Sequence, residues 1–443
     1  MIGRQTGGDR RPIQSRLHSW AGWIVVHARY YWIGVAVFCC ALLIGASRPA
    51  ADQQLRAALT RTVAGWSFDL ARWEVNAIYE KAVAWQAAQK NGVPDAENPT
   101  IVLDYLDRAY KIGRTQAEID YLMSGGTEET DDLSGLQGEL TALRDQQEEI
   151  RGQVEQVISR QIGSELEKSG LVLLNRPFPP VQFSFTEPPL KMVVSPRDRI
   201  ETIFQRMLAP EIDAATIEQS ERSIFDEENL SAYITQIGGL GAFPTMVVDQ
   251  ASLGWILSTV AHEWTHNYLT IFPLGLNYLS SADMTTINET VAEIVGDEIG
   301  ERALRTFYPE MVVTVPPRRE TMAELYVRRN LPVRFNFRDE MRETRLEVDR
   351  LLAEGKVEEA EAYMEARRLL FVEQGYGLRI LNQAYFAFHG SYGKGAASSS
   401  PIGPKLEHLR TLTPDISTFL RTVRSITSPQ QLDDTVTDWE GRQ

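Results

Sequence analysis

Apolar residues recur at helical spacing along three stretches in the first 170 positions of this 443-residue chain. In the first stretch they are Leu55, Leu59, Val63, Trp66, Leu70, Trp73, Ala77 and Ile78. The second stretch runs from about Val102 to Met123. In the third, the spacings alternate between four and three residues, which is typical of a coiled-coil seam: Leu136, Leu140, Leu143, Gln147, Ile150, Val154 and Val157. The pattern therefore predicts helical structure up to about residue 170.

Turn-forming residues separate these predicted helices. Asn91-Gly92 with Pro94 and Pro99 follows the first, and Gly125-Gly126 with the acidic run 128–132 lies between the second and the third. We expect the second and third helices to form an antiparallel hairpin. Two surface helices packed on the following domain would fit the same pattern, and the coiled-coil seam could also pair two copies of the chain.

The pattern changes near residue 170, where we expect a domain boundary. Residues 171–196 are rich in Pro, Phe and Val, which predicts short strands, and residues 232–248 look like a strand interrupted by glycines. Between these segments, residues 198–208 and 212–229 carry a helical pattern.

From Ser252 onward the chain is nearly all helical in pattern, and it includes a charged hairpin over Arg338–Gln374 that turns at Gly355. Long helical segments with a few short strands predict a mainly α protein with a small β-sheet, which is an α+β fold.

An apolar segment near the N-terminus predicts one transmembrane helix over residues 20–47. Residues 30–46 carry no charge, and with the apolar run 20–26 they reach the roughly 20 residues that a helix needs to cross a bilayer. A cleaved signal peptide has a similar order of features. The late start of the segment and its bulky aromatic residues favour an uncleaved anchor: Trp20, Trp23, Tyr30, Tyr31 and Trp32.

The distribution of charge orients this predicted anchor. Residues 1–48 hold six arginines and one acid, a charge of +5, so the rest of the chain carries −20 to give the net −15. Basic flanks stay in the cytoplasm. We therefore expect a basic cytoplasmic tail over residues 1–19, a helical stalk or hairpin region over 48–170, and an extracytoplasmic domain over 171–443.

The composition excludes several classes of protein. Most non-specific nucleic-acid affinity comes from basic residues, so this acidic chain is not expected to bind nucleic acid. Its two cysteines, Cys39 and Cys40, are adjacent and can neither staple a fold nor build a cysteine-ligated zinc site. Only six histidines are present, so their positions are informative.

Two of these histidines belong to the motif His262-Glu263-Trp264-Thr265-His266, inside an apolar segment that should form a helix. Residues four apart lie on the same helix face, so His262 and His266 can present two imidazole nitrogens to one metal ion. Neutral imidazole suits zinc. Glu263, one step round the helix, is placed to contact a water at the metal rather than the metal itself.

A second segment, Asn288 to Gly296, strengthens this interpretation. Glu289 follows His266 by 23 residues, across a connection with Pro273 and Gly275 that can set the next helix beside the first. Glu293 lies one turn after Glu289 on the same face. One carboxylate can complete a three-ligand zinc site while the other accepts a hydrogen bond from a ligand histidine.

The two segments together resemble the gluzincin metallopeptidases, the clan of thermolysin and the zinc aminopeptidases. The resemblance covers about 45 residues, and it implies that His262, His266 and Glu289 are the ligands of one zinc ion. It implies that Glu263 is the general base, and that Glu293, with Asn288 beside the third ligand, supports the site. The implied fold is a zincin-type catalytic domain over residues 171–443 with its active-site helix under a small sheet.

Clan members also use a downstream Tyr or His to stabilise the oxyanion. Here the segment from Asn382 to Gly393 offers Tyr385, His389 and Tyr392, of which we favour Tyr392 and take His389 second. The glycine-rich segment 238–246 could be an edge strand that holds a peptide substrate by β-addition.

The resemblance implies a zinc metallopeptidase that hydrolyses peptide bonds, as an aminopeptidase or an endopeptidase, and the N-terminal segment predicts that it is anchored in a membrane. The alternative is an inactive zinc-binding relative that acts as a membrane-tethered adaptor through its helical hairpins.

Overall fold

The computed structural model describes residues 51–91, 99–124, 130–173, 176–312 and 335–442. The chain divides into two compact units, residues 1–60 and 61–443, and helix α2 (Ala51–Thr62) begins in the first of them. In the described ranges, no helix has both the length and the apolar character needed to cross a bilayer. The predicted tail and span, residues 1–19 and 20–47, lie outside these ranges.

The first predicted helical stretch is divided in the structure. After α2 come a single 3-10 turn, η1 (Ala64–Trp66), and helix α3 (Leu70–Asn91). The chain leaves the helix here because its backbone bonds to a neighbouring strand end: Phe68 N donates to the Met207 carbonyl at 3.1 Å, and Trp66 O accepts from Ala209 N at 2.7 Å. The apolar spacing did not reveal this interruption.

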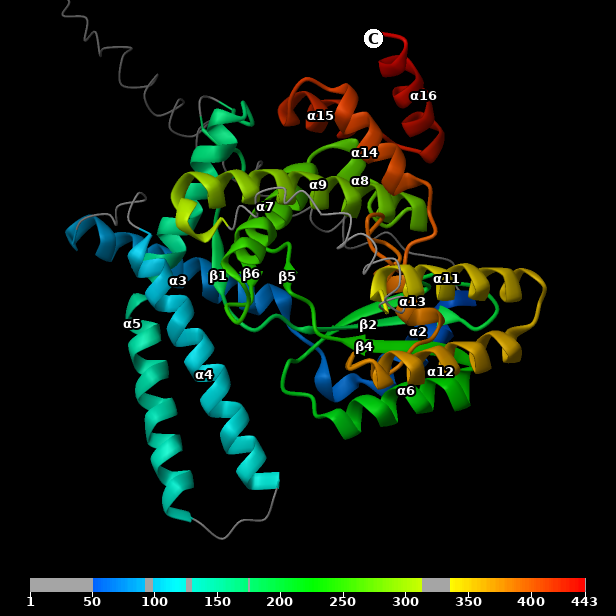
Figure 1. Ribbon diagram of the computed structural model, residues 1–443, viewed down its shortest axis with the longest axis horizontal. Helices are drawn as coiled ribbons and strands as arrows, with labels where there is room; N and C mark the ends of the chain where they lie inside the picture. Colours follow the sequence, from blue (N-terminus) through cyan, green and yellow to red (C-terminus); the bar gives the residue numbers. More distant parts are fainter. Residues whose placement is uncertain (1–50, 92–98, 125–129, 174–175, 313–334, 443) are drawn as a thin grey trace, which may run out of the picture. The chain divides into compact units, whose positions relative to one another are not determined.

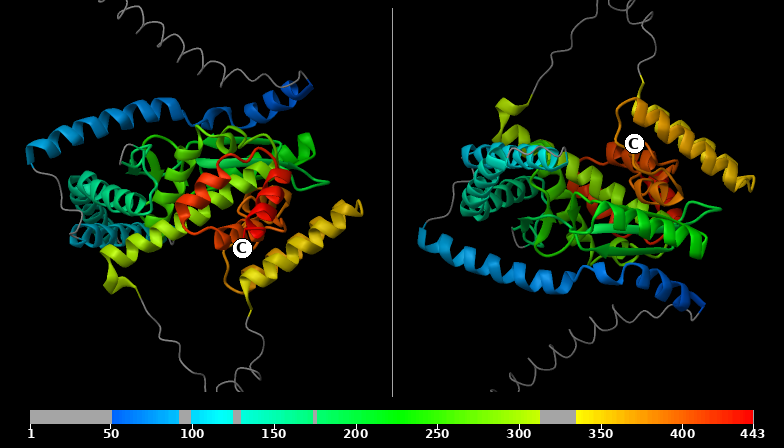
Figure 2. Two further views of the ribbon diagram at one scale, coloured as in Figure 1. Left: turned by 90° about the horizontal axis from the view of Figure 1, so that it is seen from above. Right: turned by 90° about the horizontal axis from the view of Figure 1, so that it is seen from below.

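The predicted antiparallel hairpin is confirmed. Helices α4 (Thr100–Ser124) and α5 (Thr130–Lys168) lie side by side, as Figures 1 and 2 show. Their apolar faces meet where Ile112 and Ile119 pack with Leu140. Arg144 reaches across to the Gln116 side chain at 3.1 Å.

The second half of α5 leaves the hairpin and enters the main core. Val157, Ile162 and Leu166 are fully buried there, against helices and strands that follow residue 170. The division that we expect near residue 170 therefore falls inside the compact unit of residues 61–443.

Two small sheets follow the hairpin. In the first, β1 (Phe183–Phe185) pairs in parallel with β6 (Thr245–Val247), and β5 (Gly239–Leu240) pairs antiparallel with β6 at the edge. The second sheet is antiparallel in the order β3-β2-β4, formed by β2 (Leu190–Pro196), β3 (Phe204–Leu208) and β4 (Leu230–Thr235). These strands confirm the short strands expected over residues 171–196 and 232–248.

The expectation of a helix over residues 198–208 is wrong. Five residues of this segment form β3, which runs antiparallel to β2 with Leu208 opposite Leu190 and Phe204 opposite Val194. Pairing with a neighbouring strand outweighed the local pattern. The next predicted helix, over 212–229, is confirmed as α6 (Ala214–Glu228), which is capped by Asp213.

The main core surrounds two long helices, α7 (Leu253–Leu269) and α9 (Ala282–Phe307), joined through the short helix α8 (Pro273–Leu276). Buried side chains from α5, β1 and β6 belong to the same core. The C-terminal part of the chain packs against α9 and consists of α14 (Ile402–Leu412), α15 (Ile416–Val423) and α16 (Pro429–Glu440). Figure 1 shows these helices above α9.

A second core lies on the antiparallel sheet. The charged hairpin is confirmed as α11 (Phe337–Ala353) and α12 (Val357–Glu373), with Gly355 at a φ of +73° in the turn, a conformation that favours glycine. Helix α13 (Gln383–His389) joins this core through Tyr385 and packs on β2 and β4. The described residues thus form a mainly helical protein with small sheets, as predicted.

Candidate metal centre

Helix α7 carries both histidines of the HExxH motif on one face. The helix begins at Ser252, whose side chain accepts a hydrogen bond from Trp255 N at 3.3 Å. The opposite face is apolar and buried in the main core, which fixes the rotation of the helix. His262 and His266 therefore point the same way, and their Nε2 atoms lie 3.0 Å apart.

Helix α9 brings Glu289 to these two nitrogens. Glu289 Oε2 lies 3.6 Å from His262 Nε2 and 3.5 Å from His266 Nε2. This oxygen is buried and has no hydrogen-bond donor, although such atoms in folded proteins normally have one. The three residues form a group that could hold a metal ion, with all ligand atoms within 4.8 Å of one another.

The donor set fits zinc in both chemistry and spacing. With metal–ligand distances of about 2.0–2.1 Å, neighbouring ligand atoms of a tetrahedral zinc site lie roughly 3.3 Å apart. The observed separations of 3.0, 3.5 and 3.6 Å bracket this value. A cation at this position would also satisfy the unpartnered oxygen of Glu289. Two imidazoles and one carboxylate leave a fourth position open, as catalytic zinc sites do.

Glycines on α9 allow the two helices to approach closely enough for this geometry. A Cβ on Gly296 would lie 2.8 Å from the Ser258 carbonyl oxygen and 2.9 Å from His262 Cβ. A Cβ on Gly300 would lie 2.5 Å from the Ser258 hydroxyl oxygen. Real Cβ atoms do not approach other atoms so closely, so both positions require glycine for α9 to lie against α7.

Two side chains hold the ligands in place. Asn288 Oδ1 lies 2.8 Å from His266 Nδ1, which favours the tautomer that leaves Nε2 free for a metal. The Tyr278 hydroxyl, from the loop before α9, donates a short hydrogen bond to Glu289 Oε1. One carboxylate oxygen is therefore fixed by Tyr278 while the other faces the histidines. Asn288 was named from the sequence, whereas Tyr278 was not.

The negative charge of Glu289 and the positive charge of a protonated histidine stabilise each other in this cluster. Burial by itself would raise the pKa of Glu289, but the two histidines hold that pKa well below its usual range. Burial would lower the pKa of His266, but the neighbouring carboxylates, Glu289 first, raise it to about 9. Without a metal, His266 is therefore protonated at neutral pH. A metal ion binding here must displace that proton, so its affinity should rise with pH.

Glu263 lies beside the ligands on α7 and is buried. Burial raises its pKa, which favours a group that can take up a proton near neutral pH. The edge strand β5 and the residue after it pack directly on Glu263: a Cβ on Gly239 would lie 2.6 Å from Oε1, and one on Gly241, just after the strand, would lie 3.3 Å from Oε2. The glycine-rich segment noted in the sequence thus leaves room for this carboxylate.

Glu293 lies one turn beyond Glu289, but no hydrogen bond between it and either histidine is present in the described part of the chain. Its Oε2 is buried without a donor. Burial raises its pKa, while Lys394 and His262 lower it. Asn288, rather than Glu293, is the residue bonded to a ligand histidine. The support that we expected from Glu293 is therefore electrostatic in this structure.

The two candidates for oxyanion stabilisation lie in different surroundings. Tyr392 lies close to the candidate centre, because the next residue, Gly393, donates its N–H to Thr290 Oγ1 beside Glu289. Burial raises the pKa of Tyr392 well above the usual value, and the charges of Glu289, Glu263 and Glu293 raise it further. Its hydroxyl therefore stays protonated and available as a donor.

The other candidate, His389, packs against aromatic rings on the antiparallel sheet. Its Nε2 lies 3.3 Å from the Tyr233 hydroxyl, its ring centroid is 4.3 Å from that of Tyr385, and burial lowers its pKa to about 4. Of the two residues, Tyr392 is the one whose pKa is influenced by the carboxylates of the candidate centre.

Lys191 on β2 is a second residue that the sequence did not reveal. Its amine lies 5.3 Å from the centroid of the Phe388 ring, which packs against Tyr392, so contacts connect it with the candidate centre although it is far away in sequence. Burial lowers the pKa of Lys191, and the charges of Glu289 and Glu263 oppose this effect. The alternating, Pro-rich pattern around Lys191 predicted a strand but could not show what the strand faces.

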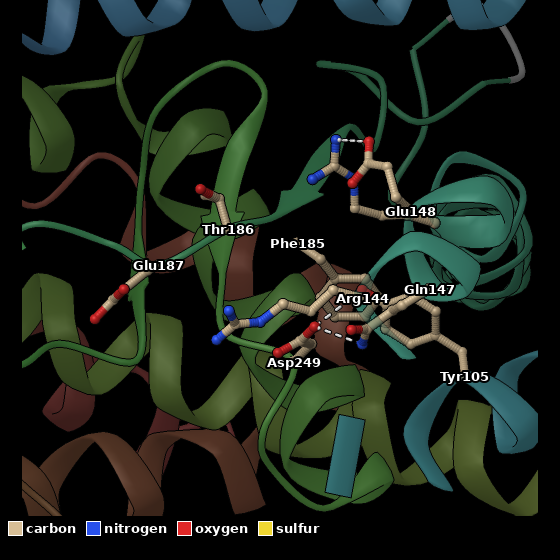
Figure 3. A pocket seen from close by; sticks show the side chains of 9 residues that line it. Tyr105, Arg144, Gln147, Glu148, Phe185, Thr186, Glu187 and Asp249 are labelled. Atoms are coloured by element: carbon tan, nitrogen blue, oxygen red, sulfur yellow. Dashed lines mark hydrogen bonds and ion pairs between the residues drawn. The ribbon is translucent and has the colours of Figure 1, made fainter. Parts of the chain in front are cut away.

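A separate cavity of about 300 Å³ lies where the α4–α5 hairpin meets the end of β1. Figure 3 shows its lining, in which Tyr105 and Gln147 from the hairpin reach Asp249 after β6. Both donate to Asp249 Oδ2, at 2.9 and 3.0 Å. None of the three metal-binding candidates lines this cavity, and its contacts fasten the hairpin to the core.

In comparisons with known proteins, no family model, no curated protein and no solved structure matches this chain.

Proposed function

We propose that the chain is a zinc metallopeptidase of the gluzincin type. The observation that carries the proposal is the cluster of His262 Nε2, His266 Nε2 and Glu289 Oε2, with the carboxylate oxygen buried and unpartnered. Glu263 lies beside this cluster, as a general base should. A metal ion shared by the three atoms would satisfy this oxygen, which has no hydrogen bond although it faces both imidazole rings.

His262, His266 and Glu289 would hold the ion, with Tyr278 and Asn288 fixing two of them. Zinc bound there supplies Lewis acidity, which makes water a better nucleophile and polarises a carbonyl group. Glu263 takes the proton from the attacking water and delivers it to the leaving amine. Tyr392 donates a hydrogen bond to the oxyanion, an interaction typically worth about 3 kcal/mol.

The substrate is a peptide in extended conformation. Strand β5 is the edge of its sheet, and Gly239 in the strand and Gly241 just after it lie against Glu263. A peptide added alongside this edge would run past the general base, and its backbone would supply most of the contacts. This position supports hydrolysis of peptide bonds rather than of small soluble esters.

The test combines metal analysis with peptide hydrolysis. Glu263→Gln should keep stoichiometric zinc and lose at least about 100-fold in kcat, because the base is removed and the ligands remain. Glu289→Ala should lose the metal. Glu139→Gln, on the exposed face of α5, is the matched control and should keep both properties.

Substantial turnover by Glu263→Gln would contradict the assignment of the base, and stoichiometric zinc in Glu289→Ala would contradict the third ligand. Zinc binding without chelator-sensitive hydrolysis by the unaltered protein is the result that the adaptor alternative predicts.

A further inference from the structure

The amine of Lys191 has no hydrogen-bond or ion-pair partner in the described part of the chain. The backbone of this residue lies in β2, between β3 and β4, and its side chain is only partly exposed. No hydrogen bond or ion pair of its amine to a described residue is present. Its nearest aromatic contact is the Phe388 ring, whose centroid lies 5.3 Å from Nζ.

A chain of contacts relates this amine to the metal centre. Phe388 packs edge-on against Tyr392, with ring centroids 6.0 Å apart. The next residue, Gly393, donates its N–H to Thr290 Oγ1 at 3.1 Å, and Thr290 directly follows Glu289. These contacts connect Lys191, through Phe388 and Tyr392, with the residue that follows Glu289 on α9.

The surroundings of Lys191 make an unpaired amine costly. Burial lowers its pKa, and only the attraction of Glu289 and Glu263 opposes this effect. A cation withdrawn from water without a contacting acceptor is unfavourable, and such groups gather at functional sites. The carboxylates that attract Lys191 do not contact it, since Glu289 Oε1 accepts from Tyr278 and Oε2 faces the histidines.

The rest of the centre is acidic. The three carboxylates of Glu263, Glu289 and Glu293 together exceed the charge of one divalent ion, so an anionic group on a peptide is held best where a further cation lies beside it. Lys191 is the cation in that position among the described residues, because Lys394 is already paired with Asp297. A free carboxylate beside Lys191 would satisfy its amine and would fix which end of the peptide faces Tyr392.

We infer that Lys191 binds a carboxylate of the substrate close to the scissile bond and thereby determines specificity. The inference rests on the proposed peptidase function and adds a substrate class to it: peptides with a free C-terminal carboxylate or an acidic side chain next to the cleaved bond. Lys191 is then a substrate-binding residue, separate from the ligands and the base.

The test compares three peptides of one sequence in the full chain: a free C-terminus, a C-terminal amide, and an amide with an acidic residue beside the cleaved bond. The unaltered protein should prefer one carboxylate-bearing peptide over the plain amide by about 10- to 100-fold in kcat/KM, mainly through KM. The preferred peptide identifies the source of the carboxylate. In Lys191→Met the ratio should fall toward one, and Lys191→Arg should retain part of it.

Lys356→Met, on the distant α11–α12 turn, is the matched control and should leave the ratio unchanged. Equal kcat/KM for all three peptides in the unaltered protein would overturn the inference. An equal loss of kcat/KM on all three peptides in Lys191→Met would also overturn it, because that result would mean that Lys191 acts on the scissile carbonyl, which all three peptides share.

A measurement of ligand binding without hydrolysis can test this inference independently of the proposed peptidase function. N-acetyl-leucine and N-acetyl-leucinamide can be titrated into zinc-loaded Glu263→Gln protein by calorimetry, with no hydrolysis required. Tighter binding of the acid, lost in Glu263→Gln/Lys191→Met, would support the carboxylate site even if no peptide were cleaved. Equal binding of acid and amide, together with equal kcat/KM for the acidic-residue peptide and the plain amide, would overturn it even if peptides were cleaved.

Discussion

Tyr278 determines how Glu289 presents its carboxylate. Its hydroxyl donates to Oε1, which leaves Oε2 directed at the two histidines. Tyr278 lies in the loop between α8 and α9, and its ring packs edge-on against His266 with centroids 6.0 Å apart. One side chain therefore orients two of the three candidate ligands.

Removing this hydroxyl should weaken metal binding. In Tyr278→Phe the ring and its packing remain, but Glu289 Oε1 loses its donor, so the carboxylate is free to rotate. Loss of a contact that orients a ligand typically costs about 10- to 100-fold in metal affinity, which competition with a chromophoric chelator would measure. Tyr79→Phe, on the exposed face of α3, is the control. An unchanged zinc affinity would show that Tyr278 does not position Glu289.

How far the sequence predicts this centre depends on the distance along the chain between its parts. His262, Glu263 and His266 are related by helix geometry alone, and Glu289 follows on the next helix, so the triad could be named from spacing. Tyr278 enters through a loop conformation and Lys191 through strand pairing, and no periodicity encodes either contact.

At the scale of elements, the edge strand β5 controls the space around the general base. Gly239 in the strand and Gly241 just after it leave room for both carboxylate oxygens of Glu263. The strand is therefore a wall of the site as well as a place for a peptide to pair.

A methyl group at residue 239 should remove activity without removing the metal. In Gly239→Ala the new Cβ would meet Glu263 Oε1 at 2.6 Å and Thr259 Cγ2 at 3.0 Å, so the carboxylate must move. We expect a loss of at least about 100-fold in kcat, as for loss of a general base, with zinc content unchanged by atomic absorption. Gly138→Ala, where a Cβ meets nothing within 4 Å, should behave as the unaltered protein.

The α4–α5 hairpin should bind to the core more strongly at low pH. Burial raises the pKa of Asp249, so the folded protein binds a proton there at a pH where the unfolded chain has lost it. The free energy of unfolding therefore decreases as pH rises from about 3.9, the usual Asp pKa, through the raised value. A salt-bridged carboxylate has the opposite effect, because its pKa is lowered in the folded protein and the free energy of unfolding then increases as pH rises.

The variant Asp249→Asn tests this pH dependence of the free energy of unfolding, because its amide oxygen can still accept hydrogen bonds from Tyr105 and Gln147 but carries no charge. We expect the free energy of unfolding at pH 7 to increase by about 1 kcal/mol, which corresponds to a rise in Tm of roughly 2 °C. This stabilisation should become smaller as the pH falls toward 4. Thermal unfolding followed by circular dichroism at several pH values would measure it. A variant less stable than the parent at pH 7 would contradict the prediction.

Elements with a continuous periodic pattern could be predicted, and elements set by pairing could not. The alternating four and three spacing of Leu136 to Val157 identified α5, and its partner α4 followed from the intervening turn. The segment 198–208 was misassigned because β3 exists through its bonds to β2. The break between α2 and α3 has the same origin, in bonds to the end of β3.

At the scale of the whole molecule, the N-terminal charge asymmetry predicts a membrane anchor. The six arginines of residues 1–48 precede the apolar segment 20–47 or lie within and beside it, and the rest of the chain is strongly acidic. We expect the full chain to stay in the membrane fraction after alkaline carbonate extraction, and a chain without residues 1–47 to be released. N-terminal sequencing of the mature protein distinguishes the anchor from a cleaved signal peptide, which would yield a start after residue 47.

The close contact of α7 and α9 has a thermodynamic consequence. Gly296 and Gly300 let the helices touch, and the candidate ligands lie on both, so a bound ion would cross-link the two helices at the centre of the main core. An ion that binds only the folded chain adds about 2.7 kcal/mol to stability at 100 times its Kd. Melting temperature then reports occupancy, and the shifts produced by different divalent ions would rank their affinities without any peptide substrate.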